Sequence, residues 1–259
     1  MRAPLLVLLA ATALACGGSP AGPPTVPSSS TAVVSAAISA AVDAPDRDPT
    51  DRDLDAGRDP KDTLAFFGIA PGMKIADLGA GRGYTSELLA RVVGDGGKVW
   101  AENPAKLLGF VGADWTVRLG KPVMKNVVRV DRELDDPLPP EAKDLDCVLM
   151  VLIYHDSVWL GVDRDKMNRA AFAALKSGGI FGIVDHSAKA GDGIKVVETF
   201  HRIEESVVID EVKRAGFVLD GQATFLKNAT DTRDWNDSPR AAGDKRGKSD
   251  RFVLRFKKP

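Results

Sequence analysis

The 259-residue chain is poor in several residue types that would assign it to a functional class at once. It has 2 cysteines, 3 histidines and 2 tyrosines, and its 35 basic side chains nearly balance 36 acidic ones. Two cysteines exclude a disulfide-dense scaffold and a zinc module with several cysteine ligands. A net charge of −1 argues against sequence-independent binding of nucleic acid, which needs clustered lysine and arginine. We therefore expect no nucleic-acid partner, and the sequence identifies no protein partner.

The chain also lacks an apolar run long enough to cross a bilayer as a helix. Its one strongly apolar segment, residues 5–14, follows a basic start and precedes small residues, as in a secretion signal. The small residues that end at Cys16 resemble the lipobox of bacterial lipoproteins. This resemblance implies a lipoprotein-type signal peptide over residues 1–16, lipidation of Cys16, and a protein anchored to a membrane in the bacterial periplasm or cell envelope. An ordinary cleavable signal with an incidental Cys16 is the alternative.

Residues 17–45 are rich in proline, serine, glycine and alanine. Such a segment buries too little apolar surface to offset its chain entropy, so we expect a flexible tether in which residues 33–42 form at most a frayed helix. The folded domain is expected over residues 46–259. Cys147 precedes an apolar run and is expected to be a buried structural thiol.

From residue 51 onward, short apolar runs alternate with amphipathic segments that often end at glycine. Residues 145–153 are continuously apolar, as in a central parallel strand, whereas Phe252, Leu254 and Phe256 alternate with polar residues, as in an antiparallel strand. This order predicts an α/β fold: a three-layer Rossmann-like sandwich with a mostly parallel seven-stranded sheet and an antiparallel C-terminal strand pair. The expected strands are 74–78, 98–101, 126–130, 145–153, 180–184, 217–225 and 251–257, and the main expected helices are 85–93, 163–175 and 204–215.

A glycine-rich loop joins the first expected strand to the helix that follows it. Gly79, Gly81 and Gly83 occupy alternate positions, where glycine permits a tight turn and lets a ligand approach the backbone. The dinucleotide-binding fingerprint would place its third glycine at the position of Tyr84, so the spacing differs from that motif. Asp77, just before the loop, can accept hydrogen bonds from loop amides or receive a ligand ammonium group.

The run of residues 75–84 resembles motif I of the class I S-adenosylmethionine-dependent methyltransferases, and residues 175–179 resemble the turn before the fifth strand of that family. The resemblance implies an enzyme that uses S-adenosyl-L-methionine as its cofactor. It implies that Glu102 or Asn103 holds the ribose and that Asp131 faces the adenine. A Rossmann-like domain with another ligand is the alternative. The expected cofactor-binding residues are Asp77, Gly79, Ala80, Gly81, Gly83, Glu102, Asn103 and Asp131.

The three histidines follow the expected fourth and fifth strands, where an open α/β sheet binds its ligands. Residues 154–156, 185–187 and 248–254 resemble a group of exported predicted methyltransferases of unknown substrate. His155 or His186 can act as the general base that removes a proton from the acceptor. For His201 we favour a solvated ion-pair face. The expected catalytic residues, facing a small-molecule acceptor, are Tyr154, His155, Asp156 and His186.

A different chemistry would use the same residues. His155, Asp156, His186 and His201 carry side chains that ligate divalent metals. No HxH, HExxH or CxxC spacing supports such a site, so the ligands would have to converge by folding alone, and we predict no metal site.

Two further expectations concern the cofactor supply and the end of the chain. S-adenosylmethionine is made in the cytoplasm, so an exported protein can instead have kept the fold as a ligand-binding or scaffolding module without methyl transfer.

The polar residues 228–248 are expected to form a mobile loop, with a lid over the cleft as the alternative.

Overall fold

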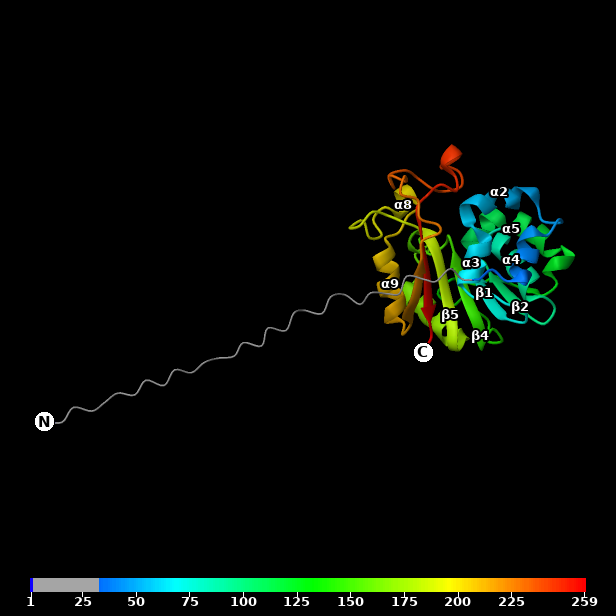
Figure 1. Cartoon of the computed structure of the whole chain (residues 1–259), viewed down its shortest axis with the longest axis horizontal. Helices are drawn as coiled ribbons and strands as arrows, with labels where there is room; N and C mark the ends of the chain where they lie inside the picture. The colour runs from blue at the N-terminus through cyan, green and yellow to red at the C-terminus, as the bar shows by residue number, and fades with distance from the viewer. Residues whose placement is uncertain (2–32) are drawn as a thin grey trace.

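The computed structural model describes residue 1 and residues 33–259. The remainder of the predicted signal peptide, including Cys16, and residues 17–32 of the predicted tether lie outside the described residues. Within the part of the chain that is described, no helix combines the length and the apolar character needed to cross a membrane. Figure 1 shows the domain that residues 33–259 form.

Seven strands form a single sheet in the order β3-β2-β1-β4-β5-β7-β6. The pairs within β1 to β5 are parallel, and β7 runs antiparallel to both β5 and β6. The predicted fold class is therefore confirmed, including the antiparallel pair at the C-terminus. The strands are β1 (Lys74–Leu78), β2 (Lys98–Glu102), β3 (Val127–Val130), β4 (Leu145–Val151), β5 (Leu175–His186), β6 (Val218–Ala223) and β7 (Arg251–Lys257).

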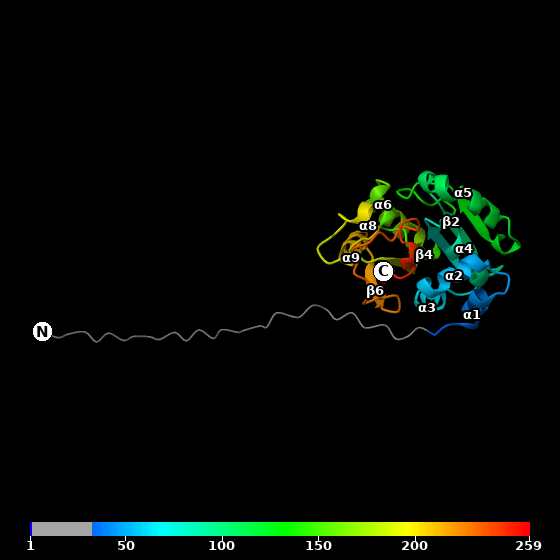
Figure 2. The same ribbon diagram turned by 90° about the horizontal axis from the view of Figure 1, so that it is seen from above.

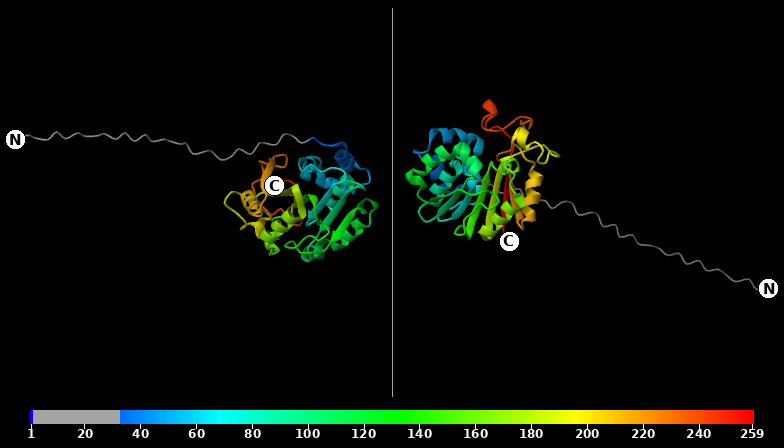
Figure 3. Two further views of the ribbon diagram at one scale, coloured as in Figure 1. Left: turned by 90° about the horizontal axis from the view of Figure 1, so that it is seen from below. Right: turned by 180° about the vertical axis from the view of Figure 1, so that it is seen from behind.

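Helices cover both faces of this sheet, as Figures 2 and 3 show. Because successive side chains of a strand point to opposite faces, Ile75 joins a core with α1, α3 and α4, whereas Ala76 joins a core with α7 and α9. The helices are α1 (Ala36–Asp43), α2 (Pro49–Arg58), α3 (Pro60–Phe66), α4 (Tyr84–Val93), α5 (Ala105–Leu119), α6 (Asp156–Trp159), α7 (Arg164–Ala174), α8 (Val197–Phe200) and α9 (Glu205–Arg214).

Helix α1 lies within the predicted tether and corrects its boundary. The Oγ atom of Ser35 accepts a hydrogen bond from the Ile38 amide at 3.2 Å and caps the helix. Ile38, Ala41 and Val42 are buried and pack in one core with side chains of α3 and α4. The folded domain therefore begins before residue 46. The high alanine content suggested weak packing, but small side chains allow this helix to lie close against its neighbours.

Helix α2 and helix α5 were absent from the sequence-based expectations. The sequence of α2, PTDRDLDAGR, has almost no apolar stripe. It is held by an aspartate cap, with the Thr50 amide donating to Asp48 Oδ1 at 2.9 Å, and by proline in its first turn. Glycines at positions 109 and 112 weaken the helical pattern of α5.

Cys147 lies in β4 and is fully buried, which confirms its predicted burial. Burial raises the pKa of its thiol far above the usual value, so the side chain behaves as a small apolar group.

Candidate functional site

The parallel strands end along one edge of the sheet, and two groups of predicted site residues meet there. The glycine loop follows β1, and His155 comes shortly after β4, the neighbour of β1 in the sheet. The loop packs against the segment that leads to His155, because a Cβ atom on Gly79 would lie 2.4 Å from Ile153 Cγ1. The loop and the histidines therefore belong to one region of the molecule.

The three loop glycines are required for two different reasons. Their φ angles of 67°, 59° and 83° lie in the left-handed region that favours glycine. A Cβ atom on Gly79 would collide with Ile153, and one on Gly83 would lie 2.4 Å from Trp115 Cζ3. A Cβ atom on Gly81 would meet nothing within 4 Å. Gly79 and Gly83 thus permit close packing, whereas Gly81 leaves its backbone open to a ligand.

Glu102 and Asn103 hold this loop from the end of β2. Asn103 Oδ1 accepts the Gly81 amide at 2.7 Å, and Asn103 Nδ2 donates to the Gly81 carbonyl at 3.1 Å. Glu102 Oε2 accepts the Gly79 amide at 3.0 Å, whereas the buried Oε1 has no hydrogen-bond partner among the described residues. Burial raises the pKa of Glu102 well above its usual value. The side-chain amide of Asn103 is therefore occupied by hydrogen bonds to the loop, whereas Glu102 retains a buried oxygen that can accept a further hydrogen bond.

Asp77 lies at the end of β1 and is almost fully buried. Ser86 donates a hydrogen bond to its Oδ2 atom at 2.6 Å. Burial raises the pKa of Asp77 to about 6, against the opposing effects of the Ser86 hydrogen bond and the Arg58 charge. This carboxyl is costly to ionise in the absence of a cationic ligand.

The two other predicted cofactor residues make simpler contacts. The Ala80 amide donates to the Glu102 carbonyl at 2.8 Å, so Ala80 helps to fix the loop on β2. Asp131 follows β3, is exposed, and forms an ion pair with Arg129 at 2.8 Å. It lies at the expected strand end, but the Arg129 guanidinium already neutralises it.

Helix α2 covers the start of α4 through a polar network that the sequence reading missed. Tyr84 donates its hydroxyl to Asp55 at 2.6 Å. Arg118 lies 2.6 Å from both Asp51 of α2 and Glu87 of α4, and its side chain is 10% exposed. Figure 1 shows α2 at the same end of the sheet as the carboxyl ends of the strands. The only sequence signal is the alternation of aspartate and arginine in residues 46–58.

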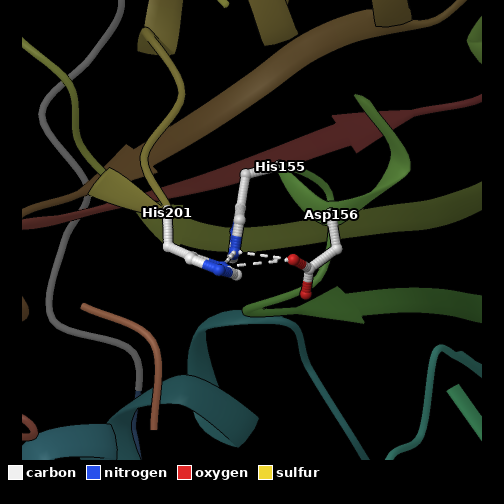
Figure 4. Close-up of side chains that lie close together, drawn as sticks. All are labelled: His155, Asp156 and His201. Carbon is white, nitrogen blue, oxygen red and sulfur yellow. Dashed lines mark hydrogen bonds and ion pairs between the residues drawn. The ribbon is translucent and has the colours of Figure 1, made fainter. Parts of the chain in front are cut away.

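His155, Asp156 and His201 converge at the end of β4, as Figure 4 shows. The Nε2 atom of His155 lies 3.1 Å from His201 Nδ1 and 3.2 Å from Asp156 Oδ1, and the last two atoms are 3.3 Å apart. The solvated face predicted for His201 is therefore wrong, because a left-handed backbone (φ 52°) turns its ring toward the other two side chains.

A buried carboxylate lies behind His155. Asp185, at the end of β5, is fully buried, contacts His155 Nδ1 at 2.7 Å and accepts the His155 amide at 2.7 Å. Burial alone would lower the pKa of His155, but the charges of Asp185 and Asp156 outweigh it and raise that pKa well above its usual value. Asp185 thus orients the ring and leaves Nε2 directed at the cluster.

Two predicted catalytic residues, Tyr154 and His186, do not join the cluster of His155, Asp156 and His201. Tyr154 is fully buried, and its hydroxyl bonds to Glu211 and Asn168 at 2.9 Å each, between α9 and α7. Its predicted position facing the acceptor is therefore wrong. His186 contacts Ser249 at 2.8 Å and Asp237 at 2.5 Å through Nδ1, and burial lowers its pKa to about 4. Its ring lies beside that of His155 but is held by the C-terminal segment.

Residues 228–248 are anchored to the domain, contrary to the predicted mobile loop. Arg202 and Asp231 form an ion pair at 2.7 Å in which both side chains are fully buried. Trp235 donates its indole N–H to Asp231 at 2.7 Å, and Arg202 stacks on the Trp235 ring at 4.6 Å. This segment therefore forms a fixed wall next to His186.

No family model matches the chain. The chain is 27% identical over 139 residues to the ubiquinone/menaquinone biosynthesis C-methyltransferase UbiE of Haemophilus ducreyi, covering 54% of this chain and 51% of that protein. It is 30% identical over 125 residues to the same enzyme of Vibrio cholerae, covering 48% and 45%. The chain thus spans about half the length of the curated relatives that it matches.

Solved structures share the fold over a larger part of the chain. A SAM-dependent methyltransferase from Aquifex aeolicus matches with a TM-score of 0.56 at 19% identity and covers 81% of this chain and 98% of its own. A S-adenosylmethionine-dependent methyltransferase from Mesorhizobium loti matches with a TM-score of 0.54 at 16% identity and covers 79% and 100%. These relatives and structures confirm the predicted resemblance to the class I S-adenosylmethionine-dependent methyltransferases, and they do not bear on the resemblance to an exported group.

Proposed function

We propose that this chain, which has the fold of the class I S-adenosylmethionine-dependent methyltransferases, transfers a methyl group from S-adenosylmethionine to a small-molecule acceptor. The observation that carries the proposal is a glycine loop in which a Cβ atom on Gly81 would meet nothing within 4 Å, together with the buried Oε1 atom of Glu102, which has no hydrogen-bond partner among the described residues. A ligand with hydroxyl groups would donate to this oxygen while it approaches the loop without meeting a Cβ atom.

Each part of S-adenosylmethionine has a proposed partner among these residues. Glu102 would accept from the ribose hydroxyls, the loop at Gly81 would approach the amino-acid moiety, and Asp77 would receive its ammonium group. Asp131 is proposed for the adenine end. When bound, S-adenosylmethionine supplies a methyl group on a sulfonium, which a nucleophile displaces in line.

The acceptor is proposed to bind next to His155. Asp185 lies against Nδ1 of His155 and leaves Nε2 directed at the cluster; in its neutral form this nitrogen would act as a general base that takes a proton from the acceptor, and Asp156 beside it would stabilise the resulting charge. A positioned base contributes about 10²–10⁴-fold to a rate, and the remaining acceleration comes from alignment of the two reactants.

The test is calorimetric titration of S-adenosylmethionine, and then of its demethylated product, into the purified protein in the presence of a metal chelator. We expect a micromolar dissociation constant, about −8 kcal/mol. Gly81→Val should abolish binding, because its side chain would fill the open approach and strain a positive φ angle. Gly72→Val is the matched control, since Gly72 also has a positive φ angle (81°) in open space but lies at the opposite end of β1.

The outcomes separate three situations. Wild-type binding that Gly81→Val removes and Gly72→Val retains supports the site, and acceptor screening for methyl transfer follows. Equal affinity in both variants would place the ligand elsewhere. Binding of the cofactor without transfer to any acceptor would support the ligand-binding module instead.

The proposal includes export and a lipid anchor on Cys16. The support is the signal-like pattern of residues 1–16 and the Pro/Ser/Gly/Ala-rich residues that follow it. Cys16→Ser should move the protein from the membrane fraction to the soluble fraction of the envelope. Unchanged fractionation of this variant, or recovery of the wild type with cytoplasmic markers, would contradict the anchor.

A further inference from the structure

Hydrogen bonds can satisfy at most two of the three contacts among His155, Asp156 and His201. Three atoms, one from each side chain, face one another at 3.1, 3.2 and 3.3 Å. At each edge of this triangle, a favourable contact needs one donor and one acceptor. Each of the three atoms presents either a proton or a lone pair to the other two. At least two of the three atoms must therefore both be donors or both be acceptors. Every assignment of protons therefore leaves one edge with two lone pairs or two N–H groups in opposition.

A cation at the centre removes this conflict. We propose that His155 Nε2, His201 Nδ1 and Asp156 Oδ1 bind a single divalent transition-metal ion. All three atoms then act as lone-pair donors toward the ion, and no proton is required between them. This proposal replaces the prediction of no metal site: the sequence spacing gave no support, but folding alone brings the ligands together.

The size of the triangle fits such an ion. Zinc bonds to histidine nitrogen and to carboxylate oxygen are about 2.0–2.1 Å long, so neighbouring ligand atoms are about 3.4 Å apart in a tetrahedral site and about 2.9 Å apart in an octahedral one. The three observed distances, 3.1 to 3.3 Å, lie within that interval. The ion would therefore enter with little rearrangement of the side chains.

The surrounding residues hold each ligand in this orientation. Asp185 contacts Nδ1 of His155 and leaves Nε2 for the ion, which is the carboxylate–histidine–metal arrangement of many metal sites. Trp159 donates to Asp156 Oδ1 at 2.5 Å. His201 adopts a left-handed backbone after α8, a conformation that is strained for a residue other than glycine and is common at ligand sites.

The ligand types select the class of ion. Two imidazoles and one carboxylate favour zinc, iron(II), cobalt(II), nickel or copper over calcium and magnesium, which prefer oxygen ligands. His186 is not in the ligand set, because the ligand atoms that converge belong to His155, Asp156 and His201, whereas the Nδ1 atom of His186 contacts Ser249 and Asp237.

The proposed metal ion would also affect the methyl-transfer reaction, and this part of the inference rests on the proposed function. With Nε2 bound to metal, His155 is unavailable as a base. An ion at this position would instead bind an oxygen or sulfur atom of the acceptor and lower its pKa, so that its proton would pass to solvent. The resulting anion would form the new bond to the methyl carbon as the C–S bond of the sulfonium breaks, and the demethylated thioether would leave. The proposed acceptor is therefore a hydroxyl or thiol compound. A chelator should then abolish methyl transfer while the calorimetric affinity for S-adenosylmethionine is retained, which separates failure of the metal site from failure of the cofactor site.

The direct test is titration of Co²⁺ into metal-stripped protein, followed by its visible ligand-field absorption, and competition by Zn²⁺. We expect one ion per chain. His201→Ala and Asp156→Ala should weaken Co²⁺ binding by at least about 100-fold, and Asp185→Asn, which acts through His155, by about 10–100-fold. The matched control is His186→Gln, a change at the neighbouring histidine that should leave the affinity and the spectrum unchanged. Thermal unfolding curves of each variant verify that it is folded.

Two results would overturn the proposal. One is a wild-type protein that binds no more Co²⁺ than the His201→Ala variant. The other is a cobalt spectrum that survives His201→Ala but is lost in His186→Gln, which would move the site to the C-terminal segment.

Discussion

Replacing Asp77 with asparagine should make the protein more stable at neutral pH. Asp77 is buried at the end of β1, and burial raises its pKa to about 6, from 3.8 in the unfolded chain. A carboxyl with a raised folded pKa binds its proton more tightly in the folded state, so the folded protein loses stability as the pH rises from 3.8 through about 6. Asparagine has nearly the same shape and no charge to desolvate.

The size of the effect follows from that difference. A shift of about 2.2 units, at about 1.36 kcal/mol per unit, corresponds to about 3 kcal/mol once the pH exceeds both pKa values. About 2 kcal/mol of this develops between about pH 4.5 and pH 8. The assay is urea unfolding of wild type and Asp77→Asn across this range, because the difference between the two curves cancels the groups that they share.

Asp146 provides a control of opposite sign at the other end of the sheet. There Lys176 and the Lys74 amide outweigh burial and lower the pKa of the carboxyl. Asp146→Asn should therefore lose stability relative to wild type as the pH rises. A stability difference between wild type and Asp77→Asn that is independent of pH would refute the reasoning about Asp77. The variant should also bind S-adenosylmethionine more weakly, since a neutral amide does not attract its ammonium group.

Other changes should have equally definite effects. Arg202→Met should lower the free energy of unfolding by about 3–5 kcal/mol by leaving Asp231 buried without its partner, and Asp231→Asn in the same chain should restore part of it, as measured by urea denaturation. Tyr154→Phe should cost about 1–2 kcal/mol of stability yet leave calorimetric cofactor affinity unchanged, because its hydroxyl faces the core. In the Cys16→Ser chain, the Cys147 thiol should react with a thiol reagent only on unfolding; rapid labelling of the native protein would contradict its burial.

The sheet could be predicted because each strand carries a local signal. Lys74–Leu78 and Arg251–Lys257 match their predicted bounds, since turn residues or alternation mark both ends. Helix α2 and the packing of α1, expected only as a frayed helix, were not predicted because the stability of both comes from contacts with distant parts of the chain. The Arg118–Asp51 ion pair, for example, joins residues 67 positions apart.

The candidate site was only partly predictable for a related reason. The glycine loop is contiguous in sequence, so its spacing reveals it. His155 and His201 are 46 positions apart, and a left-handed turn at His201 decides that they meet. The orientation of Tyr154 depends equally on tertiary structure, because its neighbours Asn168 and Glu211 come from two later helices. Likewise, the choice between Glu102 and Asn103 needed the hydrogen bonds of the loop.

The position of β7 has a consequence for the order in which the sheet can form. This strand follows β6 in the sequence, yet it pairs with β5 on one side and β6 on the other. Phe252, Leu254 and Phe256 are fully buried in the sheet core. Before β7 is in place, β5 and β6 have no strand between them, and the core that these side chains fill remains open. The sheet can therefore close only once residues 251–257 have docked, and deletion of β7 would expose two strand edges prone to aggregation.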